Sequence, residues 1–246
     1  MKKYLVIGNP VEHSLSPKLH NHWIKNNNID ATYEKQKLDN NELKDLILEI
    51  KKKKINGINV TVPFKKTVIP YLDQLSPEAK KTQSVNTIYL NNNKIIGHNT
   101  DIDGFGLGMK NIKFDVTDKK VLILGAGGVV SSIIFALNKM EVSKIIISNR
   151  TKSKAESLKI LFENLEVVDW GEIPNFDMII NATSIGLNKE DEINLDFSRV
   201  GKNKFFYDVI YNPKETNFLK IGEKLGNKTE NGKMMFIYQA RAAFEA

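Results

Sequence analysis

Val121-Leu122-Ile123-Leu124-Gly125-Ala126-Gly127-Gly128 is the stretch that decides the fold. Four consecutive apolar residues, bounded by a turn signal, are typical of a strand that is buried on both faces. The glycine-rich turn follows at once, and we expect a helix from Gly128 to Lys139. A strand, a glycine turn and a helix in this order predict a βα unit of a parallel sheet.

Alternating strands and helices extend on both sides of this stretch. They form two series, one before and one after Asp118, and such alternation implies right-handed crossovers within parallel sheets. We therefore predict an α/β protein with two domains. The expected strands are 4–8, 32–37, 57–60, 85–90, 94–97, 121–124, 144–148, 166–168, 178–180 and 205–209, and the expected helices are 16–27, 40–53, 128–139, 153–164 and 232–246.

The composition narrows the class of protein. The 246 residues are 41% hydrophobic and 26% charged, which is ordinary for a globular protein, and the absence of cysteine excludes disulfides and thiolate metal sites. The net charge of +7 comes almost entirely from scattered Lys, so no nucleic-acid partner is expected. Because the sequence shows neither a signal peptide nor a run that could span a membrane, we expect a cytoplasmic protein without a membrane partner.

The glycine turn predicts a dinucleotide site. Backbone N–H groups at a helix N-terminus favour a pyrophosphate, and glycine allows the phosphate to approach the chain. The third glycine of the usual fingerprint would fall at Val130, so the alternative is a plain tight turn.

The end of the following strand indicates which dinucleotide binds. An NAD enzyme would place an acidic residue there to hold the ribose 2′-hydroxyl, whereas this chain has Asn149-Arg150-Thr151, with Lys154 one turn further on. A guanidinium binds phosphate in a planar, bidentate manner that Lys does not reproduce. These residues favour NADP, and the alternative is a surface Arg150 that begins a helix.

Polar residues at strand ends of the first series suggest a reaction. Asn59 and Thr61 alternate along one strand, so their side chains point the same way and suit a polyol. Lys65 lies just beyond them, and Asp101 precedes a glycine-rich helix start. A Lys–Asp pair in a cleft would polarise a carbonyl and supply a proton. Taken singly, Lys65 is more simply a solvated cation and Asp101 a carboxylate at a helix N-terminus.

Two hydroxyls, Ser14 and Ser16, lie at the start of the first predicted helix, which is a natural place for a carboxylate. The alternative for Ser16 is an ordinary N-cap followed by Pro17. Asn86 adds a further polar side chain near a strand start. The four His residues form no convincing set of metal ligands, and no metal is expected.

The residues resemble those of the shikimate dehydrogenase family from end to end. The similarity is carried by these motifs: Gly8-Asn9-Pro10, His13-Ser14-Leu15-Ser16-Pro17, Asn59-Val60-Thr61-Val62-Pro63-Phe64-Lys65, Val85-Asn86-Thr87, Asn99-Thr100-Asp101, Gly125-Ala126-Gly127-Gly128, Asn149-Arg150-Thr151, Asn181-Ala182-Thr183-Ser184-Ile185-Gly186, Asp208-Val209-Ile210-Tyr211-Asn212-Pro213 and Gly232-Lys233-Met234-Met235 with Gln239. The motifs of the first series are specific to this family and its quinate-using relatives, whereas the glycine turn alone is not.

The resemblance implies the reversible NADPH-dependent reduction of 3-dehydroshikimate to shikimate, in the pathway to chorismate and the aromatic amino acids. It implies that Lys65 and Asp101 are the catalytic pair. The substrate residues that it implies are Ser14, Ser16, Asn59, Thr61, Asn86, Tyr211 and Gln239. The cofactor residues that it implies are Gly125, Ala126, Gly127, Gly128, Val129, Asn149, Arg150, Thr151, Lys154, Thr183, Val209 and Gly232.

The predicted architecture is an N-terminal α/β substrate domain and a Rossmann-type NADP-binding domain with a parallel sheet. We expect the substrate domain to comprise residues 1–100, completed by C-terminal helices within 216–246, and the NADP domain to comprise 101–215. We expect a monomer or a homodimer that acts on a small molecule. Two alternatives remain. One is a quinate/shikimate dehydrogenase with relaxed substrate and cofactor use, in which the resemblance implies a threonine in place of the second serine, so Ser16 argues against it. The other is a non-catalytic nucleotide sensor on the same fold.

Overall fold

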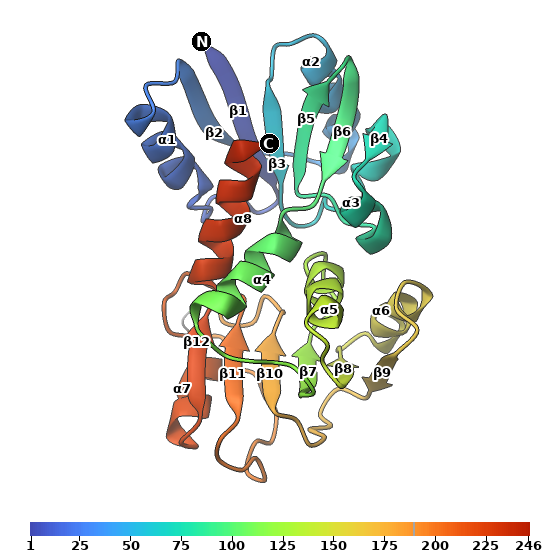
Figure 1. The fold of residues 1–246 in the computed structure, drawn as a ribbon, viewed down its shortest axis with the longest axis vertical. Coiled ribbons are helices and arrows are strands. Elements are labelled where there is room, and N and C mark those ends of the chain that lie inside the picture. Colours follow the sequence, from blue (N-terminus) through green and yellow to red (C-terminus); the bar gives the residue numbers. More distant parts are fainter. Residues whose placement is uncertain (189) are drawn as a thin grey trace. The chain divides into compact units, whose positions relative to one another are not determined.

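The computed structural model describes residues 1–188 and 190–246, which form two compact units (Figure 1). The first unit comprises Met1–Asp103 together with Gln239–Ala246, and the second comprises Gly104–Tyr238. Each unit is built around its own six-stranded sheet. The predicted mixed α/β class is therefore confirmed, and the two units are described separately below.

The sheet of the first unit is mixed. Its strand order is β2-β1-β3-β5-β6-β4, with β1 parallel to β2 and β3, and with β5 antiparallel to β3 and β6. The elements are β1 Lys2–Gly8, α1 Ser16–Asn26, β2 Ala31–Lys37, α2 Leu43–Lys51, β3 Gly57–Val60, β4 Gln74–Leu75, α3 Pro77–Thr82, β5 Thr87–Asn91 and β6 Lys94–His98. Strands β5 and β6 correspond to the expected strands 85–90 and 94–97, and they pair as an antiparallel hairpin.

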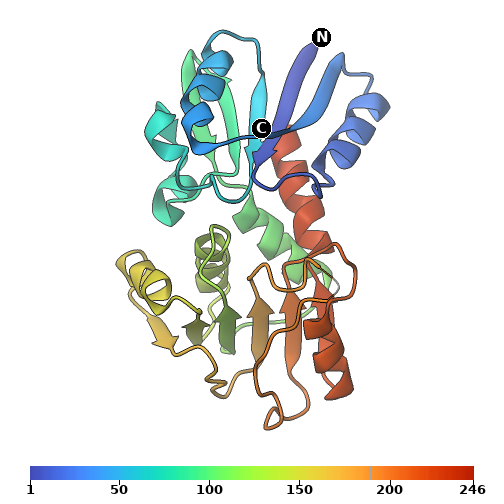
Figure 2. The ribbon, with the colours of Figure 1, turned by 180° about the vertical axis from the view of Figure 1, so that it is seen from behind.

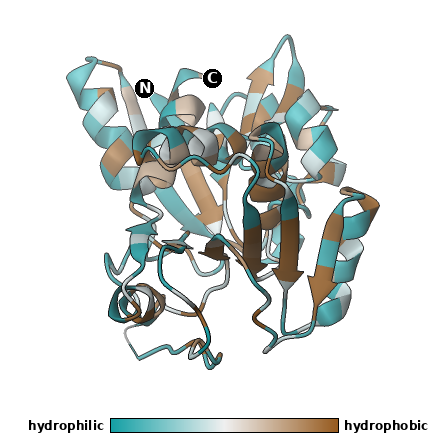
Figure 3. Ribbon diagram, turned by 60° about the horizontal axis from the view of Figure 1, so that its bottom comes forward, coloured by the Kyte–Doolittle hydropathy of each residue, from teal (hydrophilic) through white to brown (hydrophobic). Residues whose placement is uncertain are grey.

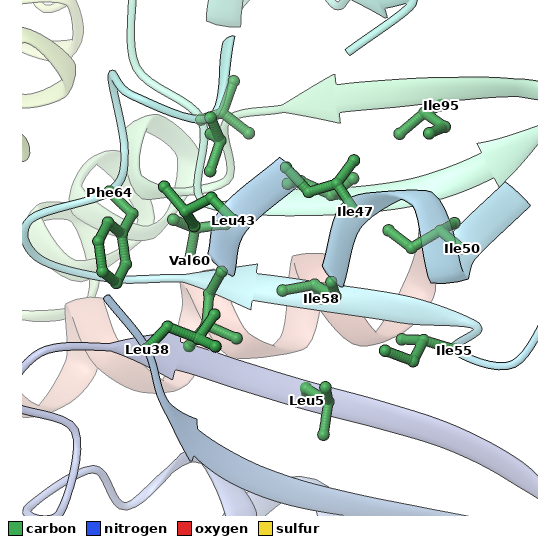
Figure 4. Close-up of a cluster of buried hydrophobic side chains, with 14 of the residues drawn as sticks. Leu5, Leu38, Leu43, Ile47, Ile50, Ile55, Ile58, Val60, Phe64 and Ile95 are labelled. Atoms are coloured by element: carbon green, nitrogen blue, oxygen red, sulfur yellow. The ribbon is translucent and has the colours of Figure 1, made fainter. Parts of the chain in front are cut away.

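Alternation of side chains along β1 divides the interior of the first unit into two cores. Leu5 and Ile7 face α2, where they join a cluster that includes Ile47 and Ile58 (Figure 4). Val6 faces the opposite way and packs in a second cluster with residues of α1 and β2. The two clusters explain why α2 and α1 lie on opposite faces of this sheet (Figure 2).

A capping box formed by Asp39 and Glu42 precedes α2. The Glu42 carboxylate accepts a hydrogen bond from the backbone N–H of Asp39 at 2.7 Å. Such a reciprocal cap satisfies N–H groups that have no partner within a helix. The first turn, Asn40–Glu42, is a 3-10 helix, and α2 itself runs from Leu43 to Lys51, so it is shorter than the predicted helix 40–53.

His20 lies in the second core of the first unit. Its ring stacks on Tyr33 with centroids 4.1 Å apart, and it is 4% exposed. Trp23 and Phe244 also contact it. Burial among these rings lowers the pKa of His20 to about 4, because an apolar environment disfavours the charged imidazolium.

We expect His20→Phe to make the protein more resistant to acid. The pKa of His20 is lower in the folded than in the unfolded chain, so the unfolded state binds more protons and stability falls as the pH drops from 6.5 towards 4. At pH 4.5 this loss is about 2 kcal/mol relative to pH 7.5. Phenylalanine keeps the stacking and cannot take up a proton.

Urea unfolding of both proteins at pH 7.5 and pH 4.5 measures this effect. The difference between the two pH values should be smaller in the variant by about 2 kcal/mol. An equal acid loss in both proteins would show that His20 makes no contribution to it.

The sheet of the second unit is entirely parallel. Its order is β12-β11-β10-β7-β8-β9, and every neighbouring pair is parallel. The elements are α4 Asp101–Asn111, β7 Lys120–Leu124, α5 Val130–Lys139, β8 Lys144–Ser148, α6 Lys152–Glu156, β9 Leu165–Val168, β10 Met178–Asn181, β11 Phe205–Asp208, α7 Asn217–Lys224, β12 Lys228–Asn231 and α8 Lys233–Glu245. The first three residues of α4 and the last seven of α8 belong to the first unit.

The four central strands of the second sheet, β7, β8, β10 and β11, are nearly continuous hydrophobic runs (Figure 3). Parallel strands that are covered on both faces have this composition. On one face Phe206 packs with Phe218 of α7, and on the other Tyr207 meets Phe105 of α4. Within the described residues, no helix is long and apolar enough to span a membrane.

Strand β12 of the second unit was absent from the sequence prediction. Strand β12 pairs with β11, so 205–209 is not the last strand, and α7 packs against both strands. The segment 216–246, which was expected to complete the first domain, is consequently divided: only Gln239–Ala246 belong to the first unit. The sequence of β12, Lys228-Thr229-Glu230-Asn231, is polar and therefore lacks the apolar pattern from which the other strands were predicted. Strand β12 lies at the edge of the sheet, where a strand need not be apolar.

Candidate active site

A buried ion pair marks the site in the first unit. The Lys65 ammonium lies 2.5 Å from Oδ2 of Asp101, and the two residues are 8% and 5% exposed. They are 36 residues apart in the sequence. A charged pair that is nearly removed from water is costly to hold unless further hydrogen bonds surround it.

The backbone on either side of Lys65 is fixed by packing. Strand β3 ends at Val60, and the chain then turns so that Phe64 enters the core of the first unit at 1% exposure (Figure 4). The Lys65 carbonyl accepts a hydrogen bond from the backbone N–H of Val85 at 2.9 Å. The Lys65 side chain therefore starts from an anchored backbone position.

Asp101 is the first residue of α4, and Asn99 holds that helix start. The Oδ1 atom of Asn99 accepts from the backbone N–H of Asp101 at 3.1 Å. Its amide nitrogen donates to the Thr82 hydroxyl at 3.0 Å and to the Ser84 carbonyl at 2.9 Å. Asn99 is fully buried. The helix start is thereby tied to α3 and to the loop that follows it.

Asn86 orients the second oxygen of Asp101. Its amide nitrogen donates to Oδ1 of Asp101 at 3.1 Å and to Oε1 of Gln239 at 3.3 Å. Its Oδ1 accepts from the backbone N–H of Thr100 at 2.8 Å, which fixes the direction of the amide. Both oxygens of Asp101 therefore receive donors, one from Lys65 and one from Asn86.

Asn59 lies one step further from the ion pair. Its Oδ1 accepts from the Tyr33 hydroxyl at 2.6 Å, and its amide nitrogen donates to the Asn86 carbonyl and the Thr87 hydroxyl. The Thr87 hydroxyl in turn lies 3.1 Å from Oδ1 of Asn86. The side chain of Asn59 thus braces Asn86, a set of contacts that the sequence did not predict.

Two predicted substrate residues lie where α1 begins. Ser16 is the first residue of α1 and is 8% exposed, and the Ser14 hydroxyl accepts from its backbone N–H at 3.3 Å. The methyl group of Thr61 lies against Gly8, where an added Cβ would be only 2.4 Å away. Tyr211 belongs to the second unit and stacks on Phe236 with ring centroids 4.2 Å apart.

The glycine turn of the second unit lies where the strand order reverses. Strand β7 is flanked by β10 on one side and β8 on the other, and a doubly wound sheet binds its ligand at such a point. Gly125 has φ +108°, and an added Cβ would lie 2.7 Å from the Ala182 carbonyl. Helix α5 begins at Val130, just after Gly127 and Gly128. The residues present therefore fit a pyrophosphate.

The predicted 2′-phosphate residues follow the next strand. Arg150 and Lys154 are exposed, and within residues 1–188 and 190–246 neither forms an ion pair. The Asn149 amide donates to the Thr151 carbonyl at 2.7 Å, which closes the turn before α6. Both cations are thus available to a phosphate at the end of β8.

The other predicted cofactor residues cluster at the ends of β10 and β11. The backbone N–H of Val209 donates to the Asn181 carbonyl at 3.0 Å. A Cβ at Gly232 would lie 2.1 Å from the Val209 carbonyl oxygen, so only glycine fits there. Thr183 donates its hydroxyl to Oδ1 of Asn181 at 2.7 Å. No group of three or more His, Asp or Glu able to hold a metal ion occurs in the described part of the chain.

Comparisons with known proteins match both units. Residues 6–88 match the shikimate dehydrogenase substrate binding domain, and residues 107–215 match the shikimate / quinate 5-dehydrogenase family. The chain belongs to the shikimate dehydrogenase family. Among its relatives, the NADP(+) shikimate dehydrogenase of Pelagibacter ubique is 63% identical over 99% of this chain and 92% of its own length.

Solved structures of the shikimate dehydrogenase family share the whole fold. The enzyme of Aquifex aeolicus has 40% identity and a TM-score of 0.92, covering 100% of this chain and 91% of its own. Another shikimate dehydrogenase, solved in complex with NADP+, has 36% identity and a TM-score of 0.93, covering 100% of this chain and 89% of its own. The predicted family and the two-domain fold are thereby confirmed.

Sequence reasoning assigned no role to several residues that build the candidate site of this protein. Asn99 and Asp208 occur in the motifs of the resemblance but were given no function. A usable signal was present: Asn181 and Asp208 each end a run of apolar residues, and they are direct neighbours in adjacent strands. No sequence signal indicated Tyr33, whose partner Asn59 is 26 residues away.

Proposed function

We propose that this protein catalyses the reversible NADPH-dependent reduction of 3-dehydroshikimate to shikimate. The observation that carries the proposal is the buried contact between Lys65 and Asp101, 2.5 Å apart, in a chain that belongs to this family. A non-catalytic nucleotide sensor on the same fold would have no use for a desolvated acid–base pair.

The reaction adds a hydride and a proton to a ketone, and bound NADPH supplies the hydride. We assign the proton to the Lys65–Asp101 pair, which protonates the ketone oxygen as it becomes a hydroxyl. Asp101 directs the Lys65 side chain through their ion pair, and Asn86 keeps Asp101 in place through a 3.1 Å hydrogen bond. In the reverse direction the same pair accepts the hydroxyl proton.

Substrate binding is assigned to polar groups of the first unit and to Tyr211. Ser14 and Ser16, at the start of α1, suit the substrate carboxylate, because a helix N-terminus favours an anion. Thr61, Asn86 and Gln239 suit the ring hydroxyls. Asn59 contributes to the same site through its hydrogen bonds to the Asn86 carbonyl and the Thr87 hydroxyl.

An assay with shikimate or quinate, each with NADP or NAD, tests the proposal. Reduced nicotinamide is followed by its absorbance, and the pair shikimate and NADP should give the highest kcat/KM. Comparable rates with quinate would favour the quinate/shikimate alternative, against which Ser16 argues. The absence of turnover in all four mixtures, with NADPH binding intact, would favour the nucleotide sensor.

We further propose that the protein acts in the cytoplasm as a monomer or homodimer. The absence of cysteine is compatible with a reducing compartment.

We expect the double variant Arg150→Ala, Lys154→Ala to lose preference for NADP over NAD. The preference comes from the 2′-phosphate, which a guanidinium can bind with paired charge-assisted hydrogen bonds. NAD lacks this phosphate, so its kcat/KM should change little, whereas that of NADP should fall roughly 10- to 100-fold, about 1.4 to 3 kcal/mol. The two side chains can share the phosphate, so either single variant should show a smaller effect.

Steady-state kinetics with both cofactors measure the ratio. Lys159→Ala is the matched control, because Lys159 is an exposed cation just beyond α6 that pairs with Glu156. An unchanged NADP to NAD ratio in the double variant would show that discrimination arises elsewhere in the chain.

A further inference from the structure

A carboxylate buried in the second unit has no part in the chemistry proposed above. Asp208 ends β11 and is fully buried. It accepts from the Asn181 amide at 3.1 Å to each oxygen, from the Ile210 backbone N–H at 3.0 Å and from the Thr216 hydroxyl at 2.6 Å. Burial raises the pKa of Asp208 to about 6. At neutral pH the carboxylate is therefore ionised, and it can accept hydrogen bonds but cannot donate them.

Asp208 and the Ile185 carbonyl, which accepts from the same amide nitrogen at 3.0 Å, together determine which way the Asn181 amide points. The two residues are direct neighbours in adjacent strands, and an acceptor-only carboxylate requires the amide nitrogen of Asn181 to face it. The amide oxygen must then face the opposite way. It accepts there from the backbone N–H of Thr183 at 3.1 Å and from the Thr183 hydroxyl at 2.7 Å.

The two residues that follow Asn181, Ala182 and Thr183, lie against the glycine turn. The Ala182 backbone N–H donates to the Leu124 carbonyl at 2.8 Å. A Cβ at Gly125 would lie 2.7 Å from the Ala182 carbonyl oxygen and 3.1 Å from Cγ2 of Thr183. The backbone at 182–183 is therefore one wall of the turn, and a shift of this wall changes the space available to a cofactor.

We propose that Asp208 is a positioning residue for the cofactor: by orienting Asn181, it holds Ala182 and Thr183 against the glycine turn. The proposal rests on NADP as the cofactor of the proposed function. The Thr183 hydroxyl donates to Asn181 and accepts from the Ile185 backbone N–H at 3.0 Å. Thr183 consequently presents its methyl group and backbone, rather than a hydroxyl proton, to the cofactor.

Asp208→Asn tests the proposal. Each oxygen of Asp208 receives donors, so an amide in its place must set an NH2 group against at least one of them. The Asn181 amide cannot turn over to accept, because its nitrogen also donates to the Ile185 carbonyl at 3.0 Å and its oxygen accepts from the Thr183 backbone N–H. The clash therefore displaces the Asn181 side chain and, with it, Thr183. We expect the dissociation constant of NADPH, measured by its fluorescence without substrate, to rise roughly tenfold or more, since hydrogen bonds to a charged group contribute more than those between neutral groups.

Thr216→Val is the matched control. It removes the 2.6 Å hydrogen bond to Asp208 and the N-cap of α7, so it also lowers the melting temperature. It leaves the contact between Asp208 and Asn181 in place, and NADPH affinity should stay within about twofold of the wild type. Equal loss of affinity in both variants, or wild-type affinity in Asp208→Asn, overturns the proposal.

A second variant covers the case in which Asp208→Asn does not fold. Exchange of the two residues, Asn181→Asp with Asp208→Asn, restores a donor facing an acceptor and keeps an oxygen towards Thr183, although it loses the hydrogen bond from residue 181 to the Ile185 carbonyl. This variant should bind NADPH better than Asp208→Asn, or within roughly tenfold of the wild type where the single variant is unfolded. A folded exchange variant that binds no NADPH overturns the proposal. Wild-type protein that binds no NADPH would instead refute the proposed cofactor.

Discussion

Lys65→Ala should lower the turnover of shikimate by roughly 100- to 10,000-fold, the usual cost of removing a general acid–base group. The Lys65 ammonium lies 2.5 Å from Asp101, and both residues are buried. Bulk water therefore has little access to take over the proton transfer. Shikimate affinity should fall much less, because Ser14, Ser16 and Asn86 remain. The expected signature is a loss in kcat that far exceeds the loss in binding.

The neighbouring residue provides the control for this experiment. Lys66 is exposed, and Lys66→Ala removes the same charge and length from the same segment. It should retain turnover within about twofold, as surface substitutions generally do. Stopped-flow and steady-state rates are compared with shikimate binding measured by calorimetry. Lys65→Ala with more than a tenth of wild-type turnover would exclude Lys65 from proton transfer.

The parts of the fold that the sequence predicts are those with strong local signals. Four apolar residues before Gly125 specify β7, and the capping residues Asp39 and Glu42 mark where the α2 region begins. Strand β12 has no such signal. Its residues are mostly polar, and it is a strand because β11 lies beside it, which is a tertiary cause.

The candidate site divides in the same way. Residue types at strand ends were enough to suggest Lys65 and Asp101 as a pair, which the structure places in contact. The network around them was not predictable, because hydrogen bonds such as that from Tyr33 to Asn59 depend on packing between distant segments. The roles of these residues in substrate and cofactor binding are still predictions.

Asp101→Asn should be as damaging as the loss of Lys65, although it removes no atom from the framework. Oδ2 of Asp101 accepts from Lys65, and Oδ1 accepts from the Asn86 amide at 3.1 Å. An asparagine must therefore place its NH2 group against one of these two donors. Asn86 cannot turn over to accept, because the Thr100 backbone N–H holds its oxygen at 2.8 Å.

The substitution also leaves the Lys65 ammonium without a negative partner. Breaking a buried ion pair from one side typically costs roughly 3–5 kcal/mol of stability. We expect turnover to fall about 100-fold or more, as for other losses within an acid–base pair, and the melting temperature to fall with it. Rates are therefore measured at a temperature at which circular dichroism shows the variant to be folded.

Asp103→Asn separates the role of Asp101 from the general effect of a carboxylate in the first turn of α4. Both residues lie in that turn, where a negative charge favours the helix, but Asp103 is exposed and pairs with no cation in the described residues. Its loss should change stability by less than about 1 kcal/mol and leave turnover within about twofold. If the two variants have the same turnover while folded, Asp101 is only a helix-stabilising carboxylate, and the proton must come from Lys65 without its help.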